Sequence, residues 1–308
     1  MRVCQPTLEG PWRQGQGEGM TTQVREGSVV VGIDGSVGGD AALGWAIRYA
    51  TARRKPLVIL NGAGDPDFYT AYSEPSRVRQ ELQEAARRVT DHAVAIARAA
   101  TTHPEIEVST PLRDARDALI ESSTRASILV VGSRGRGPVR SLLLGSVSTA
   151  VAEHASCPVA VVRPAGDDAR MGAHVVVGTD GGQASTAAVE FAFELASTEG
   201  RALKVVHSWA AHDPIMEAAG YPQHPQLINE HERMLSESLA GYAEKYPDVP
   251  VTRHVVEGGA VKTLVDLSRD AWAVVVGSRG RTGARLLLGS VSRLVVERAQ
   301  GTVVVVRP

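Results

Sequence analysis

The chain has 308 residues, of which 43% are apolar and 22% charged, and its formal net charge is −1. This length is comfortable for two domains, and the composition is that of an ordinary soluble globular protein. A net charge near zero provides no overall field that would favour nucleic acid or an anionic membrane. Two cysteines, Cys4 and Cys157, are too few for a disulfide framework and have no metal-ligand spacing, which indicates a reducing, cytoplasmic compartment.

The first 27 residues are rich in Gly, Gln and charge and have no apolar segment typical of a signal peptide. We interpret them as a disordered tail, in which Met20 is a second candidate start. The longest apolar runs, such as Val303–Val306, are far too short to span a bilayer. The sequence therefore predicts no membrane anchor.

An internal repeat organises the rest of the chain. Val29–Gly35 recurs 146 residues later as Val175–Gly181, and Val130–Arg136 recurs 145 residues later as Val275–Arg281. Near-constant offsets indicate a duplicated module. The predicted segments are a tail at 1–27, a first domain at 28–164, a polar linker at 165–171 and a second domain at 172–308.

Within each half, short β-branched runs alternate with longer helical patterns. The strands expected in the first half are 29–33, 57–61, 106–110, 127–132 and 159–162, and its helices are 40–53, 76–100, 114–125 and 147–154. The helices expected in the second half are 185–198, 226–246, 260–270 and 291–299. Apolar strands separated by helices predict a doubly wound α/β domain with a parallel sheet of five strands in each half. Ligands of such sheets bind beyond the carboxyl ends of the strands.

A glycine-rich segment follows the fourth strand of each half. In the first half it reads Gly132-Ser-Arg-Gly135, then nine residues, then Gly145-Ser-Val-Ser148 at a helix start. Glycines let backbone N–H groups approach phosphate oxygens, and a helix N-terminus favours an anion. We expect Ser146 and Ser148 to add hydroxyl donors, and Arg134, Arg136 and Arg140 to add positive charge. The alternative is that the glycines only make turns and the serines only cap the helix; duplication after a buried strand favours the phosphate site.

Together with Asp34-Gly-Ser after the first strand and Cys157-Pro-Val-Ala-Val-Val-Arg163 near the domain end, this pattern resembles the universal stress protein family. The resemblance covers Ser28–Pro308 and extends to the tandem-domain members common in actinobacteria. It implies a Rossmann-like sheet in each half that binds ATP, with an aspartate near the adenosine, the glycine segment on the phosphates and Mg²⁺ bridging them. The implied ligand set is Asp34, Gly132, Arg134, Gly135, Gly145, Ser146, Val147 and Ser148 in the first half, and Asp180, Gly277, Arg279, Gly280, Gly289, Ser290, Val291 and Ser292 in the second.

The second half departs from this pattern in two places. Eight residues instead of nine separate Gly280 from Gly289, and Asp180-Gly-Gly lacks the serine of the first copy. We expect weaker phosphate contacts there, unless Gly283 lets the shorter loop adapt. The first half differs too, because Leu112-Arg-Asp replaces Glu257-Gly-Gly and brings charge near the cleft. Both aspartates also fit a simple turn or N-cap role.

These features predict a cytoplasmic ATP-binding stress-response regulatory protein with slow or no hydrolysis. Neither phosphate segment carries a lysine, and the sequence shows no positioned general base and no zinc pattern, so we assign no catalytic and no metal-ligating residue. The alternative is an ATPase or nucleotidyl-transferase on the same fold. A nucleic-acid binder using Arg134, Arg136, Arg140, Arg279, Arg281 and Arg285 is disfavoured, because glycines and not aromatics lie between these arginines.

The last strand of each half, 158–162 and 302–306, is apolar and would form a sheet edge. Bare edges pair readily, and in the family the corresponding strands pair between subunits. We therefore expect the two halves to pair with each other, and a further homodimer is possible. His224 and His231 are expected in solvent, and Cys157 as a small buried residue at a strand start.

Overall fold

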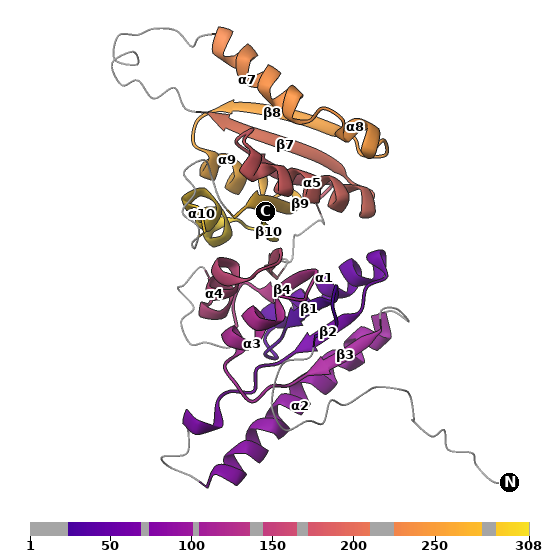
Figure 1. The fold of residues 1–308 in the computed structure, drawn as a ribbon, viewed down its shortest axis with the longest axis vertical. Helices are drawn as coiled ribbons and strands as arrows, with labels where there is room; N and C mark the ends of the chain where they lie inside the picture. Colours follow the sequence, from indigo (N-terminus) through magenta and orange to yellow (C-terminus); the bar gives the residue numbers. More distant parts are fainter. Residues whose placement is uncertain are drawn as a thin grey trace, which may run out of the picture.

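The computed structural model describes residues 24–68, 74–100, 105–135, 144–164, 172–209, 225–278 and 288–307. It contains two α/β halves, shown in Figure 1. The elements of the first half are β1 (Val29–Gly32), α1 (Val37–Arg53), β2 (Leu57–Leu60), the short 3₁₀ helix η1 (Pro66–Phe68), α2 (Pro75–Ala100), β3 (Ile106–Ser109), α3 (Ala115–Ser122), β4 (Ile128–Gly132), α4 (Ser146–His154) and β5 (Val159–Val162). Every strand and helix expected in this half is present.

Over its described residues, the second half repeats the order of strands and longer helices, except that α7 and α8 take the place of α2. Its elements are β6 (His174–Thr179), α5 (Gln183–Thr198), β7 (Ala202–Trp209), α7 (Pro225–Ser238), α8 (Tyr242–Lys245), β8 (Val251–Glu257), α9 (Ala260–Leu267), β9 (Ala271–Gly277), α10 (Ser290–Arg298) and β10 (Val303–Val306). The single helix expected over 226–246 is wrong, because the chain turns between α7 and α8. Gly241 lies there with φ of 85°, a left-handed conformation that ends a helix and that glycine adopts without strain.

The ten strands form one sheet in the order β3-β2-β1-β4-β5-β10-β9-β6-β7-β8. Within each half all neighbours are parallel, as expected from the continuous apolar strands. The halves join through β5 and β10, which pair antiparallel with Ala160 opposite Val304. The expected pairing of the two terminal strands is therefore confirmed, and it lies at the centre of the molecule in Figure 1.

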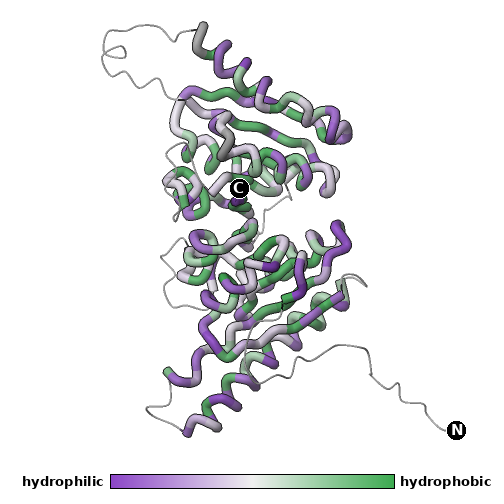
Figure 2. The backbone as a smooth tube through the Cα atoms, viewed as in Figure 1, coloured by the Kyte–Doolittle hydropathy of each residue, from purple (hydrophilic) through white to green (hydrophobic). Residues whose placement is uncertain are grey.

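Helices cover both faces of this sheet and bury its inner strands, whereas the outer strands β3 and β8 are partly exposed. Strand side chains alternate between two apolar cores: Val29 and Val31 belong to the core under α1, α2, α5 and α7, whereas Val30 belongs to the core under α3, α4, α9 and α10. In Figure 2 the hydrophobic residues accordingly follow the strands. None of the helices in the described ranges has the length and apolar character needed to cross a bilayer.

The residues just before β1 pack against the first half. Val24 is buried, and the Gly27 N–H donates to the Arg125 carbonyl at 2.8 Å. Arg25 forms an ion pair with Glu105 at the start of β3. The ordered part of the first half therefore begins before Ser28 and takes up the last four residues that the sequence assigned to the tail. Residues 1–23 and the predicted linker 165–171 lie outside the described ranges.

Candidate nucleotide-binding site

A pocket of about 340 Å³ opens at the carboxyl ends of β6, β7 and β9 in the second half. This is the edge where doubly wound sheets bind ligands, and the volume falls within the range of small-molecule sites. The predicted residues that line it are Asp180, Gly277, Gly289, Ser290, Val291 and Ser292. The other two predicted residues of this half, Arg279 and Gly280, lie outside the described ranges.

The pocket has an apolar part and a polar part. Val206, Ala260, Leu264 and Val276 provide the apolar lining. The polar part consists of Thr179, Asp180, Ser185 and Ser208 together with the N-terminus of α10, whose N-cap Gly289 makes no side-chain cap hydrogen bond to the first-turn N–H groups. Uncapped N–H groups at a helix start are suited to an anion. The arrangement therefore suits a ligand that is apolar at one end and anionic at the other.

The predicted residues of the first half lie at the equivalent edge of the sheet. Gly145 opens α4 without a side-chain cap, and its N–H donates to the Ser133 carbonyl at 2.8 Å. In the second half the Gly289 N–H donates to the Ser278 carbonyl at 2.9 Å. The glycine before the helix is thus bonded to the serine after the strand in the same way in both halves.

Two of the predicted hydroxyl donors have other partners. Ser148 Oγ donates to the Gly132 carbonyl at 2.6 Å, and Ser292 Oγ donates to the Gly277 carbonyl at 2.5 Å. A hydroxyl has one proton, so these two serines tie the helix start to the preceding strand and do not offer that proton to phosphate. Ser146 and Ser290 are exposed at the first helical position, and their role toward phosphate stays a prediction.

Gly132 is needed for the packing of the fold, in addition to the approach to a ligand for which the sequence predicts it. A Cβ on Gly132 would lie 2.5 Å from the carbonyl carbon of Gly38, and a Cβ on Gly38 would lie 2.3 Å from the Arg134 carbonyl oxygen. The N-terminus of α1 therefore packs directly against the end of β4, and both glycines are needed for this approach. At Gly145 the nearest atoms would be 3.6 Å away, so packing alone does not require a glycine there.

The aspartates lie in turns between the first strand and the first helix of each half. Asp34 Oδ1 accepts from the backbone N–H of Ser36 at 3.0 Å and from its hydroxyl at 2.6 Å, while Ser36 Oγ caps α1 through Gly39 N–H. Asp180 Oδ1 accepts from Gly182 N–H at 3.0 Å. The turn role considered for these residues is therefore present in both halves, through Oδ1.

The second turn lacks the capping serine, and α5 begins without a side-chain cap. Ser185, which corresponds to Gly39, donates through Oγ to the Gly182 carbonyl at 2.8 Å and lies 2.8 Å from Thr179 Oγ1. The Thr179 hydroxyl in turn accepts from Gly181 N–H at 3.1 Å. These hydroxyls hold the turn around Asp180, but they do not cap the first-turn N–H groups of α5 as Ser36 caps α1.

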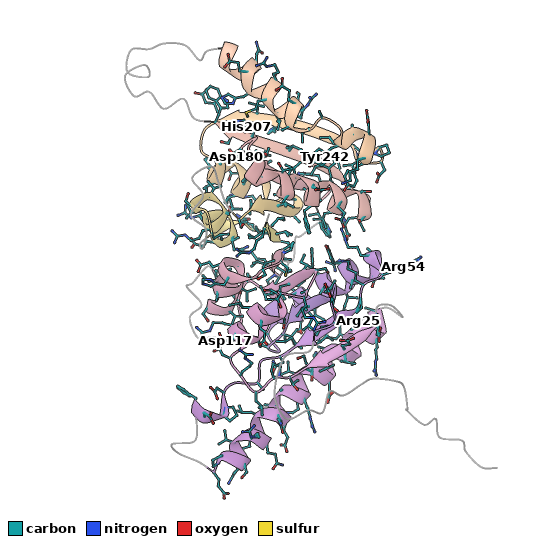
Figure 3. The ribbon with its side chains drawn as sticks, viewed as in Figure 1. Arg25, Arg54, Asp117, Asp180, His207 and Tyr242 are labelled. Atoms are coloured by element: carbon teal, nitrogen blue, oxygen red, sulfur yellow. The ribbon has the colours of Figure 1, made fainter. Side chains whose placement is uncertain are left out.

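Sequence reasoning missed the residues that hold the carbonyl before each aspartate. Asn61 Nδ2 donates to the Ile33 carbonyl at 2.7 Å, and His207 at the equivalent position lies with Nδ1 3.0 Å from the Thr179 carbonyl. Because a carbonyl only accepts, His207 Nδ1 carries the proton. Figure 3 shows His207 and Asp180 at the same end of the sheet. The repeat could have identified this pair of residues, since Asn61 and His207 both stand four residues after the equivalent leucines Leu57 and Leu203.

The sequence predicts His231 of α7 to lie in solvent, but the structure shows it in contact with other rings. Its Nδ1 lies 3.1 Å from His207 Nε2, and its ring stacks on Trp209 with a centroid distance of 4.8 Å. Burial lowers the pKa of His231, and the neighbouring His207 lowers it further. His224 lies outside the described ranges.

The start of α3 lies directly against its strand. A Cβ on Gly62 would lie 2.5 Å from Ala115 Cα, so α3 begins directly against the end of β2. Ser208 takes the place of Gly62 in the second half and donates to the Gly258 carbonyl at 2.6 Å. The glycine that permits this close approach in the first half is therefore absent from the second.

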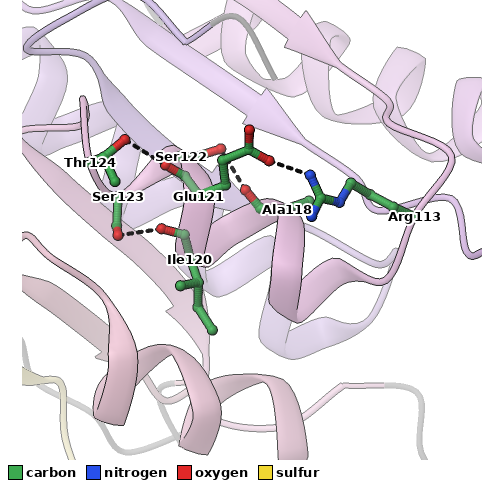
Figure 4. Close-up of polar contacts among 7 residues, drawn as sticks. All are labelled: Arg113, Ala118, Ile120, Glu121, Ser122, Ser123 and Thr124. Carbon is green, nitrogen blue, oxygen red and sulfur yellow. Dashed lines mark hydrogen bonds and ion pairs between the residues drawn. The ribbon is translucent and has the colours of Figure 1, made fainter. Parts of the chain in front are cut away.

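The extra charged residues expected near the first site, Arg113 and Asp114, each form an ion pair with another residue of the first half. Arg113 forms an ion pair with Glu121 of α3, which Figure 4 shows beside the hydroxyl–carbonyl bonds at the end of that helix. Asp114 caps α3 and pairs with Arg116 at 2.9 Å. The hydrogen bond from Arg116 lowers the pKa of Asp114. Across the described residues, no three His, Cys, Asp or Glu side chains gather as a metal site would require.

Comparison with known proteins agrees with this architecture. The profile of the Universal stress protein family matches the chain twice, over residues 27–163 and 171–307. Two universal stress proteins of Mycobacterium tuberculosis are 38% and 36% identical to it, covering 94% and 91% of this chain and 99% and 96% of their own lengths. The crystal structure of a universal stress protein from Archaeoglobus fulgidus DSM 4304 covers 92% of this chain and 97% of its own, with a TM-score of 0.67 and 21% identity. The chain therefore belongs to the universal stress protein family and carries two tandem domains of that family.

Proposed function

We propose that this protein is a cytoplasmic regulatory protein that binds ATP in each half and reports on stress through nucleotide occupancy. The observation that carries the proposal is the second-half pocket, in which an apolar lining faces the uncapped N-terminus of α10. The base and ribose of a nucleotide would lie near Val206 and Leu264, with its phosphates at Gly289 and Ser290. Asp180 would contact the ribose or the base.

Mg²⁺ would enter with the phosphates. The described lining of the pocket contains a single carboxylate, Asp180, so the protein part of the site supplies few of the oxygen ligands that Mg²⁺ prefers. A phosphate chain supplies the others. We therefore expect Mg²⁺ to strengthen the binding of ATP and to bind weakly on its own.

The pocket supports slow hydrolysis better than efficient catalysis. Its described lining residues include neither histidine nor lysine, and Asp180 is the one side chain there able to act as a general base at neutral pH. Asp180 Oδ1 is already engaged by Gly182 N–H. An ATPase or nucleotidyl-transferase remains the second candidate, and it requires a reacting group delivered to the phosphates.

A homodimer would need a different surface from the one used by single domains. β5 and β10 pair with each other inside the chain, so neither edge is available to a second copy. The outer strands of the described sheet are β3 and β8.

The test is to denature freshly purified protein and identify the released small molecules by chromatography. One universal stress protein is known in complex with cAMP and another, from Archaeoglobus fulgidus, in complex with dAMP. Both nucleotides, with ATP and GTP, are therefore the standards and the competitors in equilibrium dialysis against labelled ATP. Release or binding of ATP is expected. Protein that is free of nucleotide and does not retain labelled ATP would contradict the proposal.

A further inference from the structure

The end of α1 contacts α5 and its C-cap residue Glu199 across the junction between the two halves through ion pairs, of which the Arg53–Glu199 pair is buried and Glu194 is 54% exposed. Arg53 Nε lies 3.5 Å from Glu194 Oε1, and Arg53 Nη1 lies 3.7 Å from Glu199 Oε1. The Arg53 side chain is 7% exposed and that of Glu199 is 12% exposed. Within the described ranges neither Arg53 Nη1 nor Glu199 Oε1 has a hydrogen-bond partner, so the ion pair is what compensates for their burial.

The junction has an approximate two-fold axis that relates the two halves. Ala160 of β5 lies directly opposite Val304 of β10, and these two residues occupy equivalent positions of the repeat. The same axis relates Arg53 to Glu199, because the two stand at the same repeat offset as Val29 and Val175. The contact between Arg53 and Glu199 is therefore a contact between equivalent positions.

Arg48 and Glu194 complete the same pattern. They are equivalent to each other in the repeat. Glu194 contacts Arg53, and Arg48 interacts electrostatically with Glu199. We call these four residues the Arg/Glu cluster. Arg201 adds a further cation next to Arg48 and Glu199. At each equivalent pair, the first half has the arginine and the second half has the glutamate.

Two further features of the junction are the same in both directions, although the ring contact between Trp45 and Trp272, with centroids 5.9 Å apart, is not, because Ser127 takes the place of Trp272 in the first half. Arg163, after β5, donates to the Val296 and Glu297 carbonyls at the end of α10. Its equivalent Arg307 donates to the Ala152 carbonyl at the end of α4, at 2.9 Å. β5 and β10 are both short apolar strands. These contacts would form equally well if two identical halves paired, so they cannot select a partner.

We propose that the Arg/Glu cluster makes the junction selective: each half accepts the complementary half and rejects a copy of itself. Two first halves paired about this axis would bring four arginines together, and two second halves would bring four glutamates together. Opposed like charges at this junction are unfavourable, most of all where Arg53 and Glu199 are buried, whereas the native pairing opposes only unlike charges within the cluster. The charges of the cluster thereby favour pairing of a first half with a second half over pairing of two identical halves.

The test uses full-length chains. Glu194→Arg/Glu199→Arg gives the second half the charges of the first and so reproduces the charge set of two paired first halves. Arg48→Glu/Arg53→Glu reproduces the opposite set. We expect each double variant to lower the urea midpoint by roughly 1 M. The four-site exchange, which restores unlike charges with the sides reversed, is expected to recover more than half of either loss.

Glu190→Arg is the matched control, because Glu190 lies on α5 but pairs with Lys245 of its own half. We expect a small loss that Arg48→Glu/Arg53→Glu does not rescue. If the losses of the two double variants simply add in the four-site exchange, the charges act locally and the proposal is wrong. If a double variant does not fold, a folded four-site exchange is still the predicted result, and an unfolded one contradicts it.

Discussion

The Asp34 carboxylate lies so close to Gly135 that a Cβ on Gly135 would be 2.5 Å from Asp34 Oδ2. A methyl group there must displace either this carboxylate or the segment that carries Arg134. Both belong to the predicted nucleotide site of the first half. We therefore expect Gly135→Ala to weaken ATP binding at that site roughly tenfold or more, the effect of losing one charge-assisted contact, measured by calorimetry.

Gly44→Ala is the control for this substitution. Gly44 lies in α1, and the nearest atom to an added Cβ would be Arg48 Nη1 at 3.8 Å. Alanine is the better helix former, so this variant should bind ATP like the parent and be slightly more stable. Equal ATP affinity in Gly135→Ala and Gly44→Ala would exclude Gly135 from the site.

The two sites are predicted to be unequal, with the first binding ATP more tightly. The segment from Gly280 to Gly289 is one residue shorter than the one from Gly135 to Gly145, and Ser208 stands where the first half has Gly62. Loss of one charge-assisted phosphate contact costs about 1.5–3 kcal/mol, which corresponds to roughly ten- to a hundredfold in affinity. Separate titration of Gly135→Ala and Gly280→Ala measures the site that each leaves intact. If the Gly280→Ala variant loses the tighter site, the order of the halves is reversed.

Hydrolysis of ATP is predicted to be far slower than in ordinary enzymes, which turn over at roughly 1–10³ per second. The reason is the lack of histidine and lysine among the described lining residues of the pocket. A steady-state phosphate-release assay should give well below one turnover per second. A rate in the ordinary enzyme range that Asp34→Asn or Ser146→Ala abolishes would establish the catalytic alternative.

Cys157 is predicted to be unreactive in the folded protein. Burial raises its pKa to about 12, and its side chain is almost inaccessible. Because the thiolate is the reactive form, Ellman's reagent should not react with the native Cys4→Ser variant, in which Cys157 is the remaining thiol. After unfolding in guanidinium chloride one thiol per chain should react. Prompt reaction of the native variant would show that Cys157 is exposed during normal fluctuations.

Acidification is predicted to destabilise the second half. Burial lowers the pKa of His231 and of His174 below the ordinary value of 6.5. Both side chains are therefore neutral more readily in the folded than in the unfolded chain, so stability is full above about pH 6.5 and falls as the pH drops through their folded pKa values. The urea midpoint should decrease between pH 7.5 and 5.5. His231→Gln should reduce this decrease, and an unchanged pH dependence in that variant would exclude His231 as a cause.

The strands and most helices were predictable because the pattern was local. Apolar β-branched runs such as Val29–Val31 and Val303–Val306 have few alternatives to a buried parallel strand. The break at Gly241 was not predictable, since the surrounding residues continue a helical pattern and only the backbone shows the left-handed turn. The pairing of β5 with β10 followed from two apolar edges in one chain.

The site was predictable in position but not in every role. The repeat located Asp180, Gly289 and Ser290, which line one pocket. It could not show that the Ser292 hydroxyl donates to Gly277, or that Gly132 is needed for packing against Gly38. Such roles depend on which backbone groups lie opposite in space. The exchange of Arg53 for Glu199 is visible in the aligned repeat, but it has a meaning only once the two-fold axis brings these residues together.

We propose above all that this pair of universal stress protein domains binds ATP at the carboxyl ends of its strands. Calorimetric titration of nucleotide-free protein with ATP in the presence of Mg²⁺ tests it most directly. We predict saturable binding to one tight site and one weaker site, with the tighter site lost in Gly135→Ala and retained in Gly44→Ala. A titration with no binding heat up to millimolar ATP, repeated at a second temperature so that an enthalpy near zero does not conceal binding, would contradict it.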